Sequence, residues 1–286
     1  MKKIIAIIIC VGALAILAGC GNDQYAIEKQ YWQAQKQADK IFKNPNASPP
    51  RELERVVKLL TGFSEKHPNT NLAIDADFNI ARLYIVKEAY EQSRSQLRII
   101  LNKYRANDAI CAEALFLSGN AYQIEGKWNL ALEQYKKILQ EYPKTGRGID
   151  IPIYIAQYYK IKYQPDKMIA AYQEAIAHYQ ALAAKYPDSL LAYSADMLAT
   201  QCFIALKDWQ NAINSFNAML EKYKAAKVNK DNLLMSIALL YAKELKDQAM
   251  AKQTLERLLN EYPKSRLIKT ATELLKEMGK KWTRWN

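Results

Sequence analysis

Apolar residues recur through most of this chain with the period of an α-helix. Near its middle, Ala131, Tyr135 and Ile138 follow the spacing i, i+4 and i+7, and most positions between them are polar. This spacing places the three side chains on one helix face, so it predicts an amphipathic helix that packs against a neighbour. Gly126 precedes the helix and Pro143 follows it, which is typical of a turn and a helix end.

A second pattern precedes each such helix: a small residue is followed three positions later by an aromatic one. We expect the small residue to let a partner helix approach closely, and the aromatic ring to fill the space between the helices. The pairs are Ala81/Tyr84, Gly119/Tyr122, Ala156/Tyr159, Thr200/Phe203 and Ala238/Tyr241. Their companions in the second helices are Ser93/Leu97, Ala131/Tyr135, Ala175/Tyr179, Ala212/Phe216 and Ala251/Leu255. The pattern predicts a series of helix pairs.

The ends of the second helices also share a signature. They close at His67-Pro68, Tyr104-Arg105, Tyr142-Pro143, Tyr186-Pro187, Tyr223-Lys224 and Tyr262-Pro263. The wide spacing from Pro143 to Pro187 predicts one enlarged pair. Hydroxyl residues stand two positions after four of the prolines and are expected to cap the next helix: Thr70, Thr145, Ser189 and Ser265.

The central stretch resembles the tetratricopeptide repeat (TPR) family. The residues that carry this resemblance are Gly119, Tyr122, Gly126, Ala131, Tyr135 and Pro143, with Ser118 where a leucine is usual. The resemblance implies an all-α, right-handed solenoid of about six helix pairs over residues 25–279, with repeats somewhat longer than the usual length of about 34 residues. A final helix, Leu267 to Met278, would cap the stack. The tail 280–286 is expected to fray, or to dock on a partner or on lipid headgroups.

The first residues read as an export signal. Lys2 and Lys3 precede an apolar run from Ile4 to Ala18, which is shorter than the roughly 20 residues of a membrane span. The end of the run, LAGC, resembles the lipobox of bacterial lipoproteins. This resemblance implies a signal peptide over 1–19, acylation of Cys20 and a tether over 20–24. The alternative is an uncleaved membrane anchor. By resemblance to Gram-negative lipoproteins, Gly21 after the cysteine implies an outer-membrane location facing the periplasm, or the cell membrane in a host without an outer membrane. Two or more acyl chains would anchor the protein durably.

Composition narrows the choice of partners. The chain is 50% hydrophobic, which excludes a disordered protein, and its formal net charge of +12 is spread along the predicted helices. This distribution favours solvated helix faces over nucleic-acid binding, and leaves contact with anionic lipid or an acidic partner as the alternative. Cys111 and Cys202 fall in the first helices of repeats that are not adjacent, so we expect two buried, unbonded thiols.

The sequence holds no arrangement typical of catalysis. His67 and His178 stand outside any metal-ligand spacing, and neither a phosphate-binding glycine loop nor a nucleophile elbow is present. We therefore predict a protein that is not an enzyme, with no cofactor, no metal and no small-molecule substrate.

The combination of repeats and lipobox predicts a lipid-anchored scaffold for envelope proteins, resembling the BamD-type assembly lipoproteins and periplasmic TPR proteins. The alternatives are an accessory lipoprotein of secretion or polysaccharide export, and a non-catalytic glycan-binding module of a cell-wall enzyme complex. The TPR resemblance also implies a concave groove that binds peptides or proteins through the first helices. Its predicted residues are Phe78, Arg82, Phe116, Asn120, Gln123, Ile153, Gln157, Lys160, Met197 and Gln201.

Overall fold

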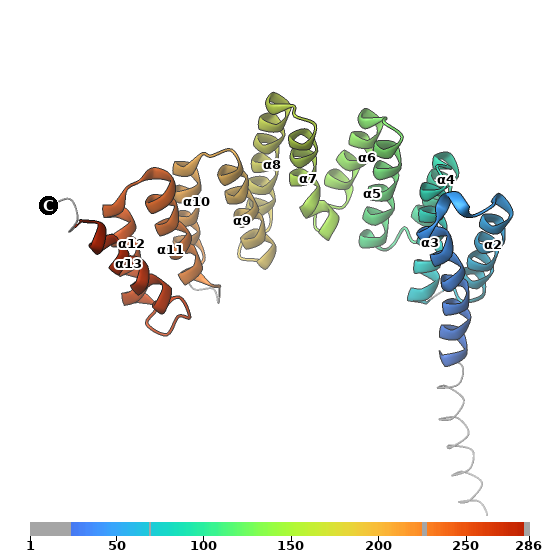
Figure 1. Cartoon of the computed structure of the whole chain (residues 1–286), viewed down its shortest axis with the longest axis horizontal. Helices are drawn as coiled ribbons and strands as arrows, with labels where there is room; N and C mark the ends of the chain where they lie inside the picture. The colour runs from blue at the N-terminus through green and yellow to red at the C-terminus, as the bar shows by residue number, and fades with distance from the viewer. Residues whose placement is uncertain (1–23, 69, 225–227, 283–286) are drawn as a thin grey trace, which may run out of the picture. The chain divides into compact units, whose positions relative to one another are not determined.

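The structure is a computed structural model that describes residues 24–68, 70–224 and 228–282. Within these ranges the chain is built from helices and contains no strand, as the sequence predicts (Figure 1). The predicted signal peptide, Cys20 and the start of the tether lie outside the described residues, as do the last residues of the tail. The chain forms two compact units that divide between Arg147 and Gly148, in the first turn of α7.

The first unit begins with a helix over residues 24–43, here called the N-terminal helix. The short helix η1 (Pro45–Ala47) follows, and Pro50 opens the next helix. The later helices are α2 (Pro50–Lys66), α3 (Asn71–Val86), α4 (Tyr90–Lys103), α5 (Asp108–Ile124) and α6 (Trp128–Glu141). Within this unit each helix from α2 to α6 packs against the next one in the chain (α2 on α3, α3 on α4, α4 on α5 and α5 on α6), so the core lies between consecutive helices.

The second unit holds the enlarged pair and the C-terminal end. Its helices are α7 (Gly146–Ile161), α8 (Pro165–Lys185), α9 (Leu190–Ala205), α10 (Trp209–Lys222), α11 (Lys230–Leu239), the π-helix η2 (Leu240–Leu245), α12 (Gln248–Glu261) and α13 (Ile268–Trp282). The predicted extra length lies in α8, which has 21 residues where α6 and α10 have 14. The last helix continues to Trp282, beyond the predicted end at Met278, and includes the first residues of the predicted tail.

The small residues of both helices are buried at the helix crossings, which confirms the helix-pair prediction. Ala81, Ala156 and Ala238 are buried in the first helices. Gly119 lies so close to the second helix that a Cβ atom there would stand 2.3 Å from Cε1 of Tyr135. No side chain fits at that separation, so this crossing depends on glycine.

The turns within the pairs share one backbone conformation. Gly126 has a φ of +81°, and Glu88, Tyr163, Lys207 and Lys246 take the same left-handed conformation in the other turns. In each turn the following residue donates its N–H to the carbonyl of the aromatic residue, for example Lys127 to Tyr122 and Asp208 to Phe203. This bond closes the end of the first helix and offsets the cost of left-handed backbone outside glycine, about 1–2 kcal/mol.

The last pair contains one additional residue between its small residue and its turn. Ala238 and Lys246 are eight positions apart, whereas Gly119 and Gly126 are seven apart. The closing hydrogen bond accordingly runs from Asp247 to Tyr241 with one more residue enclosed. The π-helix η2 covers this segment, and its wider turns accommodate the insertion.

Helix ends also follow the predicted signals. The residues His67, Tyr104, Tyr142, Tyr186, Tyr223 and Tyr262 each cap the C-terminus of a second helix. Thr70 and Ser189 accept hydrogen bonds from the N–H groups of Ala73 and Ala192, which confirms them as N-caps. These bonds satisfy backbone donors that the first turn of a helix leaves unpaired.

Candidate functional site

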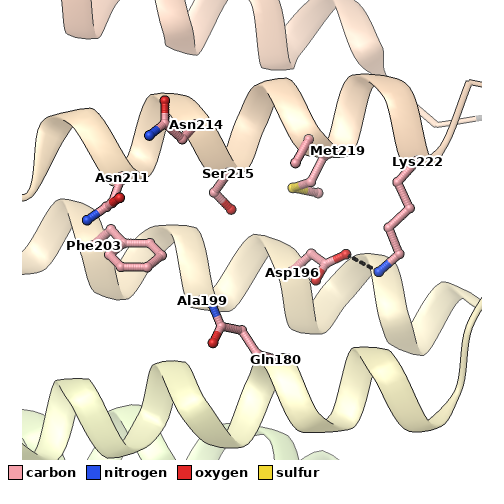
Figure 2. Close-up of a pocket in the computed structure, with 10 residues that line it drawn as sticks. Gln180, Asp196, Ala199, Phe203, Asn211, Asn214, Ser215, Met219 and Lys222 are labelled. Carbon is pink, nitrogen blue, oxygen red and sulfur yellow. Dashed lines mark hydrogen bonds and ion pairs between the residues drawn. The ribbon is translucent and has the colours of Figure 1, made fainter.

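A groove of 390 Å³ runs between α8 and α10 in the second unit, with α9 beneath it (Figure 2). We call it the amide groove. Its lining residues are Gln180 on α8, Asp196, Ala199 and Phe203 on α9, and Asn211, Asn214, Ser215, Ala218, Met219 and Lys222 on α10.

The walls of the amide groove are polar but uncharged over most of their length. Gln180, Asn211 and Asn214 are exposed, and each amide both donates and accepts hydrogen bonds. The Asn211 Nδ2 donates to Asp208 Oδ2 at 2.7 Å, and Gln210 Nε2 donates to Asn214 Oδ1 at 3.1 Å. These contacts orient the two asparagines along the groove.

The floor is formed by small and apolar groups held by α9. Ala199 is buried, while Phe203 lies half-buried at one end. Thr200 Oγ1 lies 2.6 Å from Ser215 Oγ and 2.8 Å from the Asp196 carbonyl, to which it donates. Thr200 therefore ties α9 to α10 directly beneath the groove.

An ion pair stands at the other end of the groove. Asp196 Oδ2 accepts a hydrogen bond from Lys222 Nζ at 2.7 Å, and another from the Tyr223 hydroxyl at 2.7 Å. Burial, followed by the Asp196 carboxylate, raises the pKa of Tyr223, so the phenol stays protonated and remains a donor. The ion pair anchors the end of α10 to α9.

The first unit repeats this arrangement at the same sequence spacing. Asp77 Oδ2 accepts hydrogen bonds from Lys103 Nζ and the Tyr104 hydroxyl, each at 2.8 Å. Sequence reasoning missed both clusters. A signal was available, because Tyr104 and Tyr223 are the two closing tyrosines that no proline follows.

The apolar residues predicted for the concave groove are largely packed within their own units. Phe78 and Phe116 are buried, and Ile153 and Met197 are half-buried. Arg147 lies over the Phe116 ring at 3.6 Å from the centroid, which covers the face of that ring. Phe78 and Phe116 therefore contribute to helix packing.

Among the polar residues predicted for the concave groove, Arg82 contacts other side chains of the protein, whereas three others are exposed. Arg82 donates to Asn79 Oδ1 at 3.2 Å and lies 3.7 Å from Asp75 Oδ1. Gln157, Lys160 and Gln201 are exposed. The ten predicted residues are shared between the two units, so a single groove made by all of them stays a prediction.

Asn120, one of the predicted groove residues, also has a role in packing. The hydroxyl of the fully buried Tyr135 donates to Asn120 Oδ1 at 2.9 Å and lies 3.2 Å from Gln123 Oε1. A buried phenol needs such a partner, so Asn120 contributes to the core of its repeat. Spacing alone could not reveal this, because it does not show where the ring of the next helix points.

The described residues also bear on the predictions about metals, cysteines and histidines. No group of His, Cys, Asp and Glu residues within them could hold a metal ion, and none of their helices is long and apolar enough to cross a membrane. Cys111 and Cys202 are free and buried, as expected, and burial raises the pKa of Cys202 to about 12. Burial also lowers the pKa of His178, which keeps the ring neutral.

Comparison with known proteins agrees with the repeat architecture. The family model described as tetratricopeptide repeat matches residues 113–145, 156–189 and 233–265. No curated protein matches the chain. Similar solved structures include the C-terminal part of a TPR repeat-containing protein from Cytophaga hutchinsonii, which is 19% identical, with 79% of this chain and 78% of that chain covered and a TM-score of 0.42.

Two further structures are similar at lower scores. PilF of Pseudomonas aeruginosa is 12% identical, with 84% of this chain and 95% of that chain covered and a TM-score of 0.34. The TPR2AB domain of yeast Sti1 in its pHSP90 complex is 17% identical, with 88% and 99% covered and a TM-score of 0.32. The chain therefore has an all-α fold with three segments that match the tetratricopeptide repeat, and such repeats imply a protein-interaction scaffold.

Proposed function

We propose that this chain is a lipid-anchored scaffold of the bacterial envelope that binds a segment of a partner protein in the amide groove. The observation that carries the binding proposal is that, apart from the Asp196–Lys222 pair at one end, the lining of this groove is uncharged in a chain whose net charge is +12. Gln180, Asn211 and Asn214 offer hydrogen-bonding groups on both walls. Covering amides costs less free energy than covering charges, so a partner can desolvate this groove at a lower cost than a charged surface.

An extended peptide segment suits the chemistry of the groove. Its backbone presents alternating donors and acceptors, which side-chain amides can match in either sense. The small residues Ala199 and Ala218 leave room for a close approach. Phe203 at one end provides an apolar contact for a side chain of the segment, and the Asp196–Lys222 pair limits the other end (Figure 2).

The anchor and the compartment rest on the sequence. The lipobox at Cys20 supports acylation, and Gly21 supports an outer-membrane, periplasm-facing location. The resemblance to BamD-type lipoproteins supports a role in the assembly of envelope proteins. A solenoid tethered beside the bilayer would hold its partner close to the membrane, where such assembly takes place.

Site-specific photo-crosslinking tests the binding proposal. A photoreactive residue at position 214 in α10 should capture a discrete envelope protein in cells, which mass spectrometry identifies. The matched control is position 133 in α6, which occupies the same place two residues after the buried small residue of its helix. No adduct at 214, or equal capture at both positions, would contradict the proposal, as would glycan binding without any protein partner.

Acyl labelling tests the anchor separately. Cells fed a fatty-acid probe should label the natural protein, and Cys20→Ser should abolish the label. Persistent labelling of the Cys20→Ser variant would disprove the lipobox interpretation while leaving the groove proposal intact.

A further inference from the structure

The N-terminal helix presents an unpartnered stripe of lysine and aromatic residues. Successive members are three or four positions apart, so they share one helix face. The stripe consists of Tyr25, Lys29, Trp32, Lys36, Lys40 and Lys43. We call it the N-terminal stripe. Figure 1 shows the N-terminal helix in blue, with its first turns extending past α2 and α3.

The opposite face of the helix is buried in the first unit. Ala34, Ala38 and Ile41 pack in a core cluster with Leu60 of α2 and Ile80 of α3. This packing fixes the rotation of the helix about its axis, so the N-terminal stripe faces solvent. Its direction is therefore set by the core and not by the stripe residues themselves.

The exposure of the two aromatic residues needs an explanation. Tyr25 is 66% exposed and Trp32 is 59% exposed, and a hollow of 490 Å³ opens beside them against Leu72. Lys36 Nζ lies 5.0 Å from the centroid of the Trp32 ring. Large exposed aromatic rings flanked by lysines are typical of surfaces that meet a membrane interface, where the rings sit at headgroup level.

The charge of the stripe selects the type of lipid. Four lysines stand on the stripe, and the acidic residues beside it are Glu28 and Asp39. Glu28 accepts a hydrogen bond from Gln24 at 2.8 Å, and Asp39 accepts one from Gln35 at 2.8 Å. Both acids stay on the flank of the stripe, which leaves the excess positive charge for anionic headgroups.

Position in the chain favours a membrane over an acidic protein as the occupant. Tyr25 stands five residues after Cys20, and five residues of chain reach about 18 Å at most. On the proposed acylation of Cys20, the start of the stripe is thus held next to the bilayer surface. A helix of this composition binds in the plane of the interface.

We propose that the N-terminal stripe is a second membrane contact that lies on anionic phospholipid headgroups beside the acyl anchor. This inference rests on the proposed lipid anchoring and adds an orientation to it. The acyl chains set the distance from the membrane, and the stripe sets which side of the first unit faces it. A single acyl attachment point cannot fix that rotation by itself.

Vesicle binding of the unacylated mature chain, residues 20–286 with Cys20→Ser, tests the stripe without the anchor. This chain should sediment with vesicles of equal parts phosphatidylglycerol and phosphatidylcholine, and remain in solution with phosphatidylcholine alone. High salt should release it. Replacing the four stripe lysines by Gln should weaken binding at least about tenfold. Equal binding to both vesicle types, or none to the anionic vesicles, would overturn the proposal.

A charge-matched variant controls for the overall positive charge. Lys136, Lys137, Lys269 and Lys276 are exposed and lie on other helices, so their replacement by Gln removes the same charge elsewhere. This control should keep most of the vesicle binding. If it loses as much as the stripe variant, the attraction belongs to the whole chain and the assignment is wrong.

The fluorescence of Trp32 provides a second measurement, whose result does not depend on the charge of the chain alone. Vesicles with brominated acyl chains should quench part of the tryptophan emission of the bound chain, and Trp32→Phe should remove that quenching while the melting temperature is kept. Unchanged quenching in the variant would exclude Trp32 from the interface and overturn the proposed orientation. Acyl labelling of Cys20 is measured separately, so failure of the anchor and failure of the stripe give different results.

Discussion

The amide groove in the second unit and the corresponding surface in the first unit use the same helix positions for opposite purposes. The corresponding surface is formed by α4, α5 and α6, and its residues follow by counting from the buried small residue of each helix. Gln180, Asn214 and Ala218 of the amide groove correspond to Arg98, Glu133 and Lys137. The surface of the first unit is therefore charged where the amide groove is neutral.

The aromatic position shows the difference most clearly. Phe203 lines the amide groove, whereas its counterpart Tyr122 is covered by Arg94, whose guanidinium lies 4.2 Å from the ring centroid. Arg94 is buried and pairs with Glu125 at 2.6 Å and Glu91 at 3.0 Å. In the second unit the position of Arg94 is held by Ile176. One unit covers this surface with an ion network, whereas the other has Ile176 at the position of Arg94 and forms the amide groove.

The ion network gives the largest expected effect. Glu125→Gln leaves the buried Arg94 short of one carboxylate partner, and should lower the free energy of unfolding by about 2–3 kcal/mol. Urea unfolding measures the loss. The control Glu133→Gln changes an exposed residue on α6 and should stay within about 0.5 kcal/mol. Equal effects of the two variants would show that the network does not stabilise the first unit.

The ion pair of Glu125 and Arg94 also predicts that the free energy of unfolding depends on pH. Hydrogen bonds from Lys127 and then Arg94 hold the pKa of Glu125 below its usual value of 4.5. A lowered carboxyl pKa stabilises the folded state above the unfolded pKa, and the gain is lost as the pH falls through the folded pKa. The difference between the natural chain and Glu125→Gln should therefore be constant above about pH 5 and shrink below about pH 4. A difference that grows in acid would contradict this assignment.

The helix crossing at Gly119 gives the next effect. Gly119→Ala places a methyl group against Tyr135 and should cost about 1–2 kcal/mol by overpacking. The other helix pairs have Ala81, Ala156, Thr200 and Ala238 at this position, so the restriction is specific to the crossing of α5 and α6. Gly62→Ala is the matched control, because no atom lies within 4 Å of its Cβ position, and it should stabilise α2 by up to about 1 kcal/mol. Thermal unfolding of the two variants should shift in opposite directions.

Exchanging the charges of the two surfaces tests the binding side of the comparison. Asn214→Glu combined with Ala218→Lys brings the residues of α6 into the amide groove, and should reduce partner capture about fivefold, or about 1 kcal/mol. All four positions of the exchange are exposed, so stability should change little. The reverse exchange, Glu133→Asn with Lys137→Ala, should leave capture as it is. If the variant with Asn214→Glu and Ala218→Lys captures the partner fully, the amide groove is not the binding surface.

The smallest effect is expected on the first helices. Gln157→Ala combined with Gln201→Ala changes two exposed residues of the predicted concave groove and should keep the melting temperature within about 2 °C. Partner capture should also be retained if the amide groove is the binding surface. If partner capture is lost while the melting temperature is unchanged, the partner binds at the concave groove and not at the amide groove.

The helix pairs were predictable from sequence because small and aromatic residues mark each crossing directly. The second helices end at the predicted tyrosines, and the extra length fell within the predicted pair. The turns at Glu88 and Lys207 were less visible, since their left-handed backbone is imposed by a hydrogen bond to the preceding helix and not by glycine. Local composition does not report such a bond.

The candidate site was harder to predict for a similar reason. Gln180 and Asn214 lie on separate second helices, and only the packing of both against α9 brings them to one groove. The family resemblance directed attention to the first helices instead. The charge difference between matched positions, such as Asn214 and Glu133, is nevertheless present in the sequence and becomes informative once the repeats are aligned.

The π-helix η2 lets this repeat accommodate one additional residue without a change in the helices that follow. One inserted residue in a regular α-helix turns every later side chain by about 100°, which would rotate the buried face of the helix toward solvent. The widened turns of Leu240–Leu245 take up the insertion before α12 begins, and Ala251 and Leu255 keep their buried positions. A codon gained or lost in this segment therefore need not disturb the helices that follow, so η2 is a suitable joint for recombining repeats from different chains.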